Sequence, residues 1–350
     1  MQHTTAPRTR RLLVGAAAAA TLVLAGCAAD PEGAAPGASE GGGGDTMRIA
    51  YLATGSSLPL FVTAEKYAEE VGIDVELVEV ASGNESITGV ATAQYDAGFA
   101  GIGSAAYNAV AEGLPVRYVA PMHSGYIEDY FIISSQLAGS EEEAATIAED
   151  MSSLAGQTFA ANAPGVVTEA LLAFALERGG LAMDQINLEH IPFPDQVPAL
   201  ANGGIAAGIL SEPFPTQAEA NGSGYRPWAT PTDEEPLPFT GIIYNTDWAE
   251  ENPELAADFL RAYAMAAEDL EENGWDTPEM LELVEEYTGA DPAIVAASRQ
   301  HHISADLTVD FDVLLRYQEF FMQQGSLNYD EIIPEEDIWD FTWRDAALAG

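Results

Sequence analysis

Cysteine and basic residues are scarce in this sequence. Its 350 residues contain one cysteine, Cys27, and one lysine, Lys66. A single cysteine excludes an intramolecular disulfide, so outside the cell such a chain must be stabilised by packing. The 12 Lys and Arg stand against 56 Asp and Glu, and the formal net charge is −44. This charge makes nucleic acid and anionic lipid headgroups poor partners.

Long apolar runs are absent beyond residue 27, so no later segment is predicted to cross a membrane. At the N-terminus, Arg8, Arg10 and Arg11 precede an apolar run at residues 12–24, which is too short to span a bilayer. A basic segment followed by a short apolar run is typical of an export signal.

The apolar run ends in Leu24-Ala25-Gly26-Cys27, which resembles the lipobox of bacterial lipoproteins. The resemblance implies that residues 1–27 are a lipoprotein signal peptide and that Cys27 is a lipid anchor, not a catalytic thiol. The alternative is an ordinary cleaved signal with a chance cysteine. Residues 9–13 also resemble a twin-arginine signal, so the export route stays open.

Residues 28–46 are rich in Ala, Gly, Pro and Ser and lack an apolar pattern, which predicts a flexible tether. The roughly 300 residues that follow suggest two domains. An apolar content of 47% is sufficient for their cores. The acids occur in separate runs and not at one metal-binding spacing, which favours a solvated acidic surface and salt tolerance over a cation site.

From residue 47 onward, β-rich runs alternate with amphipathic segments. The first set predicts strands at residues 48–53, 74–80, 97–100 and 116–121, and helices at 60–71, 86–94 and 104–112. The second set predicts strands at 131–134, 158–161, 188–191 and 208–210, and helices at 168–178 and 196–202. The first set favours a parallel α/β sheet, and the second set favours a second α/β unit.

The last third of the chain is predicted to be mostly helical. After a strand at residues 240–245, helices are expected at residues 253–273, 277–287, 292–298 and 311–324. Prolines in three of the expected first turns support these starts. The matching N-caps are Asn252, Thr277 and Asp291.

Seven short motifs follow one another along residues 47–228. They are Gly55-Ser56-Ser57, residues 94–98, residues 113–116, residues 154–158, Pro164-Gly165, residues 195–204 and residues 211–214. Because of these motifs and their order, the chain resembles the substrate-binding proteins of bacterial ABC importers. The resemblance is to the group that binds sulfonates, taurine, nitrate and thiamine-pyrimidine precursors. Two positions depart from that pattern: Gln157 replaces a usual lysine, and Ser211 replaces a frequent tryptophan.

The resemblance implies an α/β fold, the two-lobed type II periplasmic-binding-protein fold with two crossing strands. The implied division is lobe one at residues 47–122 and 246–350, lobe two at 132–238, and crossover hinges at 123–131 and 239–245. It further implies a monomer that needs no cofactor, delivers a small molecule to a permease on a separate chain, and lies on the outer face of the cell membrane, or in the periplasm of a Gram-negative cell.

The ligand is expected beyond the carboxyl ends of the strands, where loops enter helices. These loops present backbone N–H groups and small hydroxyls at helix starts, which suits an oxyanion. The candidate ligand-binding residues in the loops are Ser56, Ser57, Asn84, Gly103, Ser104, Gly165, Val166 and Thr168. The alternative is that the hydroxyls only cap their own helices.

Three further candidates lie at strand ends and near a hinge. Asp195 and Glu212 would accept hydrogen bonds from an amine or a ring N–H, and Tyr126 would stack on an aromatic ligand. Their alternatives are a helix cap, a turn-stabilising acid and ordinary packing. No arginine belongs to the predicted loops.

Enzymatic motifs are weak. Gly101, Gly103 and Ala106 satisfy G-x-G-x-x-A, but they follow the third strand and no acid stands about twenty residues later. The histidines are scattered, which argues against a zinc site. We therefore expect a binding protein for a sulfonate or related organic anion, with a nitrogen heterocycle such as a thiamine-pyrimidine or riboflavin precursor as the alternative.

Overall fold

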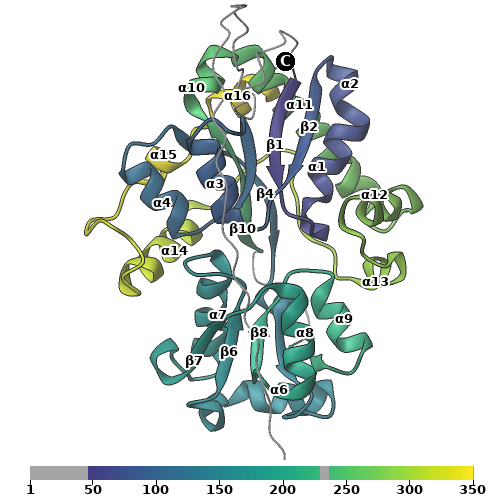
Figure 1. The fold of residues 1–350 in the computed structure, drawn as a ribbon, viewed down its shortest axis with the longest axis vertical. Coiled ribbons are helices and arrows are strands. Elements are labelled where there is room, and N and C mark those ends of the chain that lie inside the picture. Colours follow the sequence, from purple (N-terminus) through teal and green to yellow (C-terminus); the bar gives the residue numbers. More distant parts are fainter. Residues whose placement is uncertain (1–45, 229–235, 350) are drawn as a thin grey trace, which may run out of the picture. The chain divides into compact units, whose positions relative to one another are not determined.

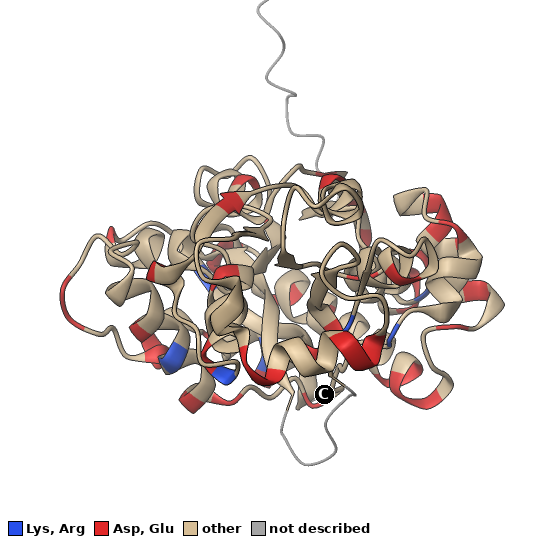
Figure 2. Ribbon diagram, turned by 90° about the horizontal axis from the view of Figure 1, so that it is seen from below, with Lys and Arg blue, Asp and Glu red and all other residues tan. Residues whose placement is uncertain are grey.

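The computed structural model describes residues 46–228 and 236–349. The expected signal peptide, Cys27 and almost all of the tether lie outside these residues. Among the residues described, no helix is long and apolar enough to cross a membrane. Asp and Glu residues are spread over many helices and loops, whereas Lys and Arg residues are few (Figure 2).

The first sheet has five strands in the order β2-β1-β3-β10-β4 (Figure 1). They are β2 (Asp74–Glu79), β1 (Thr46–Tyr51), β3 (Ala97–Gly101), β10 (Leu237–Asn245) and β4 (Val116–Gly125). Strand β1 runs parallel to β2 and β3, but β10 runs antiparallel to β3 and β4. The expected parallel sheet is therefore wrong in part, because the returning strand β10 inserts between β3 and β4.

The second sheet also has five strands, in the order β7-β6-β8-β5-β9. They are β7 (Asn187–His190), β6 (Thr158–Ala161), β8 (Ala207–Ile209), β5 (Phe131–Ser134) and β9 (Gly224–Tyr225). Strand β6 is parallel to β7 and β8, and β5 is antiparallel to β8 and β9. The α/β class is confirmed, and both sheets are mixed.

The chain passes between the sheets twice. It leaves β4 and enters β5 through the short helix α5 (Ile127–Tyr130), and it returns after β9 to begin β10 at Leu237. The predicted second crossover, residues 239–245, falls within β10, where the backbone pairs with both neighbours in the first sheet.

Helices flank both sheets (Figure 1). With the first sheet are α1 (Leu58–Val62), a π-helical turn (Thr63–Tyr67), α2 (Ala68–Val71), α3 (Gly83–Ala91) and α4 (Ser104–Ala111). With the second are α6 (Glu141–Glu149), α7 (Val167–Arg178), α8 (Phe193–Asn202) and α9 (Phe214–Ala220). The C-terminal helices are α10 (Thr246–Glu251), α11 (Pro253–Asn273), α12 (Pro278–Thr288), α13 (Pro292–Ala297), α14 (Phe311–Gln323), α15 (Glu335–Ile338) and α16 (Thr342–Leu348).

The helix caps follow the sequence in most places. The side chains of Thr277 and Asp291 accept hydrogen bonds from backbone N–H groups at the starts of α12 and α13, as predicted. Asn252 is the N-cap residue of α11, as predicted, but its side chain makes no capping bond: its amide donates to the carbonyl oxygen of Trp248 in α10. Helix α6 was not expected; Glu141 to Glu143 form its first turn, where carboxylates are favourable.

The C-terminal segment packs against both halves of the chain. Its helix α14 places Tyr317 in a stacked contact with Phe174 of α7, with ring centroids 5.8 Å apart. Arg316 lies over the same Phe174 ring at 4.5 Å. One continuous apolar core accordingly includes residues of β4, β5, α7 and α14.

Candidate functional site

A cavity of about 70 Å³ lies where the two sheets face one another, several times the space that one water molecule needs. The first sheet and its loops, the crossing segments and the second sheet all contribute to its wall. The lining residues are Leu52, Thr54, Ser56, Gly83, Phe99, Gly101, His123, Tyr130, Asn162, Val166, Val167, Thr168, Leu171, Phe193, Ile209, Leu210, Ser211, Phe239 and Thr240.

Paired hydroxyl and amide groups form part of the polar wall. In the loop after β1, the Thr54 and Ser56 hydroxyls are hydrogen-bonded at 2.7 Å. On the opposite side, Thr168 Oγ1 donates to Asn162 Oδ1 at 2.7 Å, across the loop between β6 and α7. Both pairs are neutral, and each hydroxyl oxygen can make a further bond to a ligand.

Two buried histidines lie at the cavity: His123 lines it, and His301 contacts the lining residue Tyr130. His123 Nδ1 is 2.5 Å from Thr240 Oγ1, and His301 Nδ1 is 2.6 Å from the Tyr130 hydroxyl. Burial lowers the pKa of His123 well below 6.5 and that of His301 to about 3, so both rings are uncharged at neutral pH. Burial also raises the pKa of Tyr130, which stays a neutral phenol.

Aromatic rings supply much of the apolar wall. Tyr130 meets Phe239 edge to face, with centroids 4.5 Å apart, and His123 meets the same Phe239 at 5.8 Å. Phe99 and Phe193 also line the cavity. Such rings favour a flat, unsaturated ligand.

The two rims of the cavity are hydrogen-bonded to each other through Ser104 at the start of α4. Its N–H and its Oγ both donate to the Gly165 carbonyl oxygen, at 2.8 and 3.0 Å. Asn84 Nδ2 donates to the Pro164 carbonyl oxygen at 3.4 Å. A side chain at Gly103 would bring a Cβ within 2.6 Å of the same Gly165 oxygen, so glycine permits this close approach.

The structure brings only some of the predicted site residues to the cavity. Ser56, Val166 and Thr168 line it. Asn84, Gly103, Ser104 and Gly165 join the rims and do not line the cavity. Ser57 is fully buried, and its Oγ donates to the Leu52 carbonyl oxygen at 2.6 Å.

The three candidates at strand ends and near the hinge lie elsewhere. Asp195 is exposed in the first turn of α8. Tyr126 packs edge to face on His302 at 5.2 Å. Glu212 is buried and forms an ion pair with Arg226, and its Oε1 accepts the Arg299 N–H at 3.2 Å. None of the three lines the cavity.

Sequence reasoning did not select several residues that do line the cavity. Thr54, Asn162 and Thr240 contribute polar atoms, and Phe99 and Phe239 contribute rings. A positional signal was available for two of them, because Thr54 and Asn162 lie in the loops that follow β1 and β6. Phe99, Phe239 and Thr240 lie within β3 and β10 and carried no such signal.

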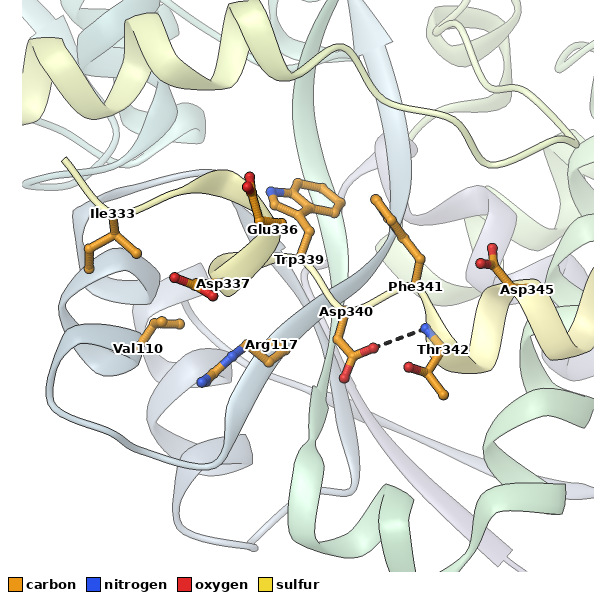
Figure 3. Close-up of a pocket in the computed structure, with 10 residues that line it drawn as sticks. All are labelled: Val110, Arg117, Ile333, Glu336, Asp337, Trp339, Asp340, Phe341, Thr342 and Asp345. Atoms are coloured by element: carbon orange, nitrogen blue, oxygen red, sulfur yellow. Dashed lines mark hydrogen bonds between the residues drawn. The ribbon is translucent and has the colours of Figure 1, made fainter.

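A wider hollow of about 740 Å³ lies near the C-terminus, between β4 and the segment from α15 to α16 (Figure 3). Its polar groups serve local structure. Asp340 accepts the Thr342 N–H at 2.9 Å, and Arg117 Nη1 donates to the Val116 carbonyl oxygen at 2.7 Å. Unlike the cavity between the sheets, it has no convergent set of neutral polar groups. Within the described part of the chain, no cluster of three or more His, Cys, Asp or Glu could hold a metal.

Solved structures share this fold. The ligand-binding component of an ABC-type import system from Staphylococcus aureus, with zinc bound, gives a TM-score of 0.72 at 13% identity over 87% of this chain and 99% of that chain. The alkanesulfonate-binding protein SsuA from Xanthomonas axonopodis pv. citri, bound to MOPS, gives 0.63 at 18% identity over 82% and 96%. The periplasmic nitrate-binding protein NrtA from Synechocystis PCC 6803 gives 0.66 at 17% identity over 87% and 89%.

The likeness to these proteins confirms the periplasmic-binding-protein fold that the sequence motifs predict. Among curated proteins, no sequence matches this chain. The family model described as the NMT1-like family matches residues 41–283, which include both sheets and the cavity between them. On that match, the chain belongs to the NMT1-like family.

Proposed function

We propose that this protein is the solute-binding component of an ABC importer. It captures a small organic molecule between its two halves outside the cytoplasm and delivers it to a permease on a separate chain. The observation that carries this proposal is the cavity lined from both sheets and both crossing segments. The NMT1-like family and the fold neighbours support it, and they also support the expectation that the chain is not an enzyme.

Closure of the two halves is part of the proposal. We take residues 47–122 and 246–350 as lobe one and 132–238 as lobe two. Residues 123–131 and 239–245 are the crossover hinges of this proposal, and Tyr130 and Phe239 of these segments line the cavity. Ser104 and Gly165 would then close the rims over a bound ligand, and Ser56, Val166 and Thr168 would contact it.

The ligand class expected first from the sequence is a sulfonate or related organic anion, and the alternative is a nitrogen heterocycle. The aromatic wall of Phe99, Tyr130, Phe193 and Phe239 supports the second. The neutral hydroxyl, amide and imidazole groups add hydrogen-bonding positions for ring nitrogens and carbonyls.

Ligand capture predicts stabilisation by a small molecule. A true solute at 100 times its dissociation constant should raise the free energy of unfolding by about 2.7 kcal/mol. The measurement is a thermal-shift screen of the purified protein against taurine, alkanesulfonates, nitrate, thiamine precursors and riboflavin, followed by calorimetric titration of each hit. Turnover of a solute, instead of reversible binding, would contradict the proposed function.

We further propose that Cys27 is acylated and holds the protein at the outer face of the cell membrane, with residues 28–46 as the tether. Cys27→Ser should therefore abolish incorporation of labelled fatty acid and move the protein from the membrane fraction to the soluble fraction. The control is Ser39→Ala, a substitution within the tether, which should leave the fractionation unchanged. Membrane retention of Cys27→Ser would contradict the anchor.

A further inference from the structure

The wall of the cavity between the sheets is uncharged. Within residues 46–228 and 236–349, none of its lining residues is Asp, Glu, Lys or Arg. Its one histidine, His123, is held neutral by burial, and its one tyrosine, Tyr130, is held as the phenol. Residues 229–235, outside the described part, contain no Lys or Arg in their sequence.

Each basic residue that follows Cys27 interacts with a group outside the cavity wall. Seven form ion pairs with acids: Arg48, Lys66, Arg178, Arg226, Arg261, Arg299 and Arg344. Arg117 binds backbone carbonyl oxygens, and Arg316 stacks on Phe174. No cation of the described chain is therefore left to compensate an anion in the cavity.

The helix that begins at the cavity already carries its own carboxylate. Val166, Val167 and Thr168 form the start of α7 and line the cavity. Glu169 in the same first turn is buried, and its Oε2 accepts the Gly165 N–H at 2.9 Å. Its Oε1 lies 2.5 Å from His190 Nε2. The positive end of α7 is thus offset by Glu169 before any ligand arrives.

The second helix start at the cavity also carries a carboxylate in its first turn. Gly83, in the first turn of α3, lines the cavity. Glu85 in that turn is exposed; its carboxylate accepts the Ala81 N–H at 2.8 Å, and its own N–H donates to Ser82 Oγ at 3.2 Å. An anion in the cavity would therefore find no Lys or Arg in the wall and a buried carboxylate at the start of α7, and an uncompensated buried charge costs several kcal/mol.

We infer, building on the proposed function, that the solute is an uncharged polar molecule with a flat unsaturated part, and that Glu169 is the residue that excludes anions. The neutral donors and acceptors of the wall bind its polar atoms, and the rings of Phe99, Tyr130, Phe193 and Phe239 pack on its faces. The penalty for binding is greater for an anion than for a cation, because the buried charge nearest to the wall is the Glu169 carboxylate.

The test compares ligands that share a shape and differ in charge. A metabolite screen by thermal shift would include matched pairs such as nicotinamide with nicotinate and benzenesulfonamide with benzenesulfonate. Calorimetry would then give the dissociation constants of both members for every pair that produces a hit. We expect the uncharged member to bind at least about tenfold more tightly.

Glu169→Gln tests the role of the carboxylate, since glutamine retains an acceptor for the Gly165 N–H. The anionic member of each pair should gain about tenfold in affinity while the uncharged member changes little. Glu177→Gln is the matched control, because Glu177 is exposed near the other end of α7 and its substitution should change neither affinity. Asn162→Lys, which adds a cation to the wall and leaves Glu169 in place, should likewise raise anion affinity.

The outcomes separate the inference from the proposed function. Tighter binding of the anionic members to the unaltered protein would overturn the inference and leave the solute-binding function in place. Equal anion affinities in Glu169→Gln and Glu177→Gln would overturn the role of Glu169. If no small molecule of either charge binds, the proposed function fails, and the inference fails with it.

Discussion

Replacing Arg226 with leucine is expected to lower the free energy of unfolding by about 3–5 kcal/mol. The guanidinium is buried, pairs with Glu212, and donates to Glu219 Oε2 at 2.7 Å. It also donates to the Asp129 carbonyl oxygen at 3.0 Å and to Thr216 Oγ1 at 3.1 Å. Leucine supplies none of these donors and leaves the Glu212 carboxylate buried without its cation.

The pKa of Glu212 makes the destabilisation of Arg226→Leu depend on pH. Burial raises this pKa, and the charge of Arg226 lowers it in part. Without Arg226 the carboxyl group takes up a proton more readily, so the destabilisation should be larger at pH 8 than at pH 5. Urea unfolding at the two pH values measures this difference.

Two variants control for this prediction. Arg261→Leu breaks the partly exposed pair with Asp258 and should cost less than about 1 kcal/mol. Arg226→Leu combined with Glu212→Gln removes the uncompensated charge and should recover much of the loss. A single-variant loss no greater than that of Arg261→Leu would contradict the assigned role of the buried network.

Local sequence pattern located the elements well. The predicted strands at residues 131–134 and 158–161 and the helix at 253–273 have the bounds found in the structure. Runs of apolar residues and prolines in a first helical turn are local signals, so they predict an element without knowledge of its tertiary contacts. Helix α6 was missed because its first turn of three glutamates has the composition of an exposed loop.

Strand direction and the composition of the cavity could not be predicted in the same way. A β-rich run has no intrinsic direction, so the antiparallel insertion of β10 between β3 and β4 left no trace in the pattern. His123 and Thr240 meet only because β4 and β10 pair in that register. Glu212 looked available for a ligand, because its partner Arg226 is brought to it by tertiary packing.

Acidification from pH 6 to pH 4 is expected to reduce the free energy of unfolding by about 2–3 kcal/mol through His301, and His123 acts in the same direction. Burial lowers the pKa of His123 well below 6.5, and the neighbouring His301 lowers it further. Burial lowers the pKa of His301 to about 3, with a smaller contribution from His302. The two imidazole rings lie with centroids 4.6 Å apart, and Tyr130 and Trp275 also contact His301.

The direction of this effect follows from the proton balance. In acid the unfolded chain protonates both histidines near pH 6.5, whereas the folded protein keeps them neutral. Their contribution to stability is complete above about pH 6.5 and is lost as the pH falls toward the folded-state pKa values. Glu335 acts oppositely: burial raises its pKa to about 7, so its contribution is lost as the pH rises through that value.

Single-histidine variants isolate the effect from that of the acids. In His301→Asn the slope of unfolding free energy against pH, measured by urea unfolding between pH 6 and pH 4, should be smaller than in the unaltered protein by about 1.4 kcal/mol per pH unit. His302→Gln, which alters an exposed neighbour, should leave the slope nearly unchanged. An equal slope in His301→Asn and the unaltered protein would contradict a neutral buried imidazole.

The neutral histidines also hold groups of the cavity wall in place. Nδ1 of His123 is hydrogen-bonded to the hydroxyl of Thr240 and Nδ1 of His301 to that of Tyr130, and both hydroxyl residues line the cavity. A protonated imidazole can only donate, so each hydroxyl would then have to act as acceptor. Because the folded protein keeps both rings neutral between pH 6 and pH 4, solute affinity should stay nearly constant over this range and decline only as the pH approaches about 3, the pKa of His301.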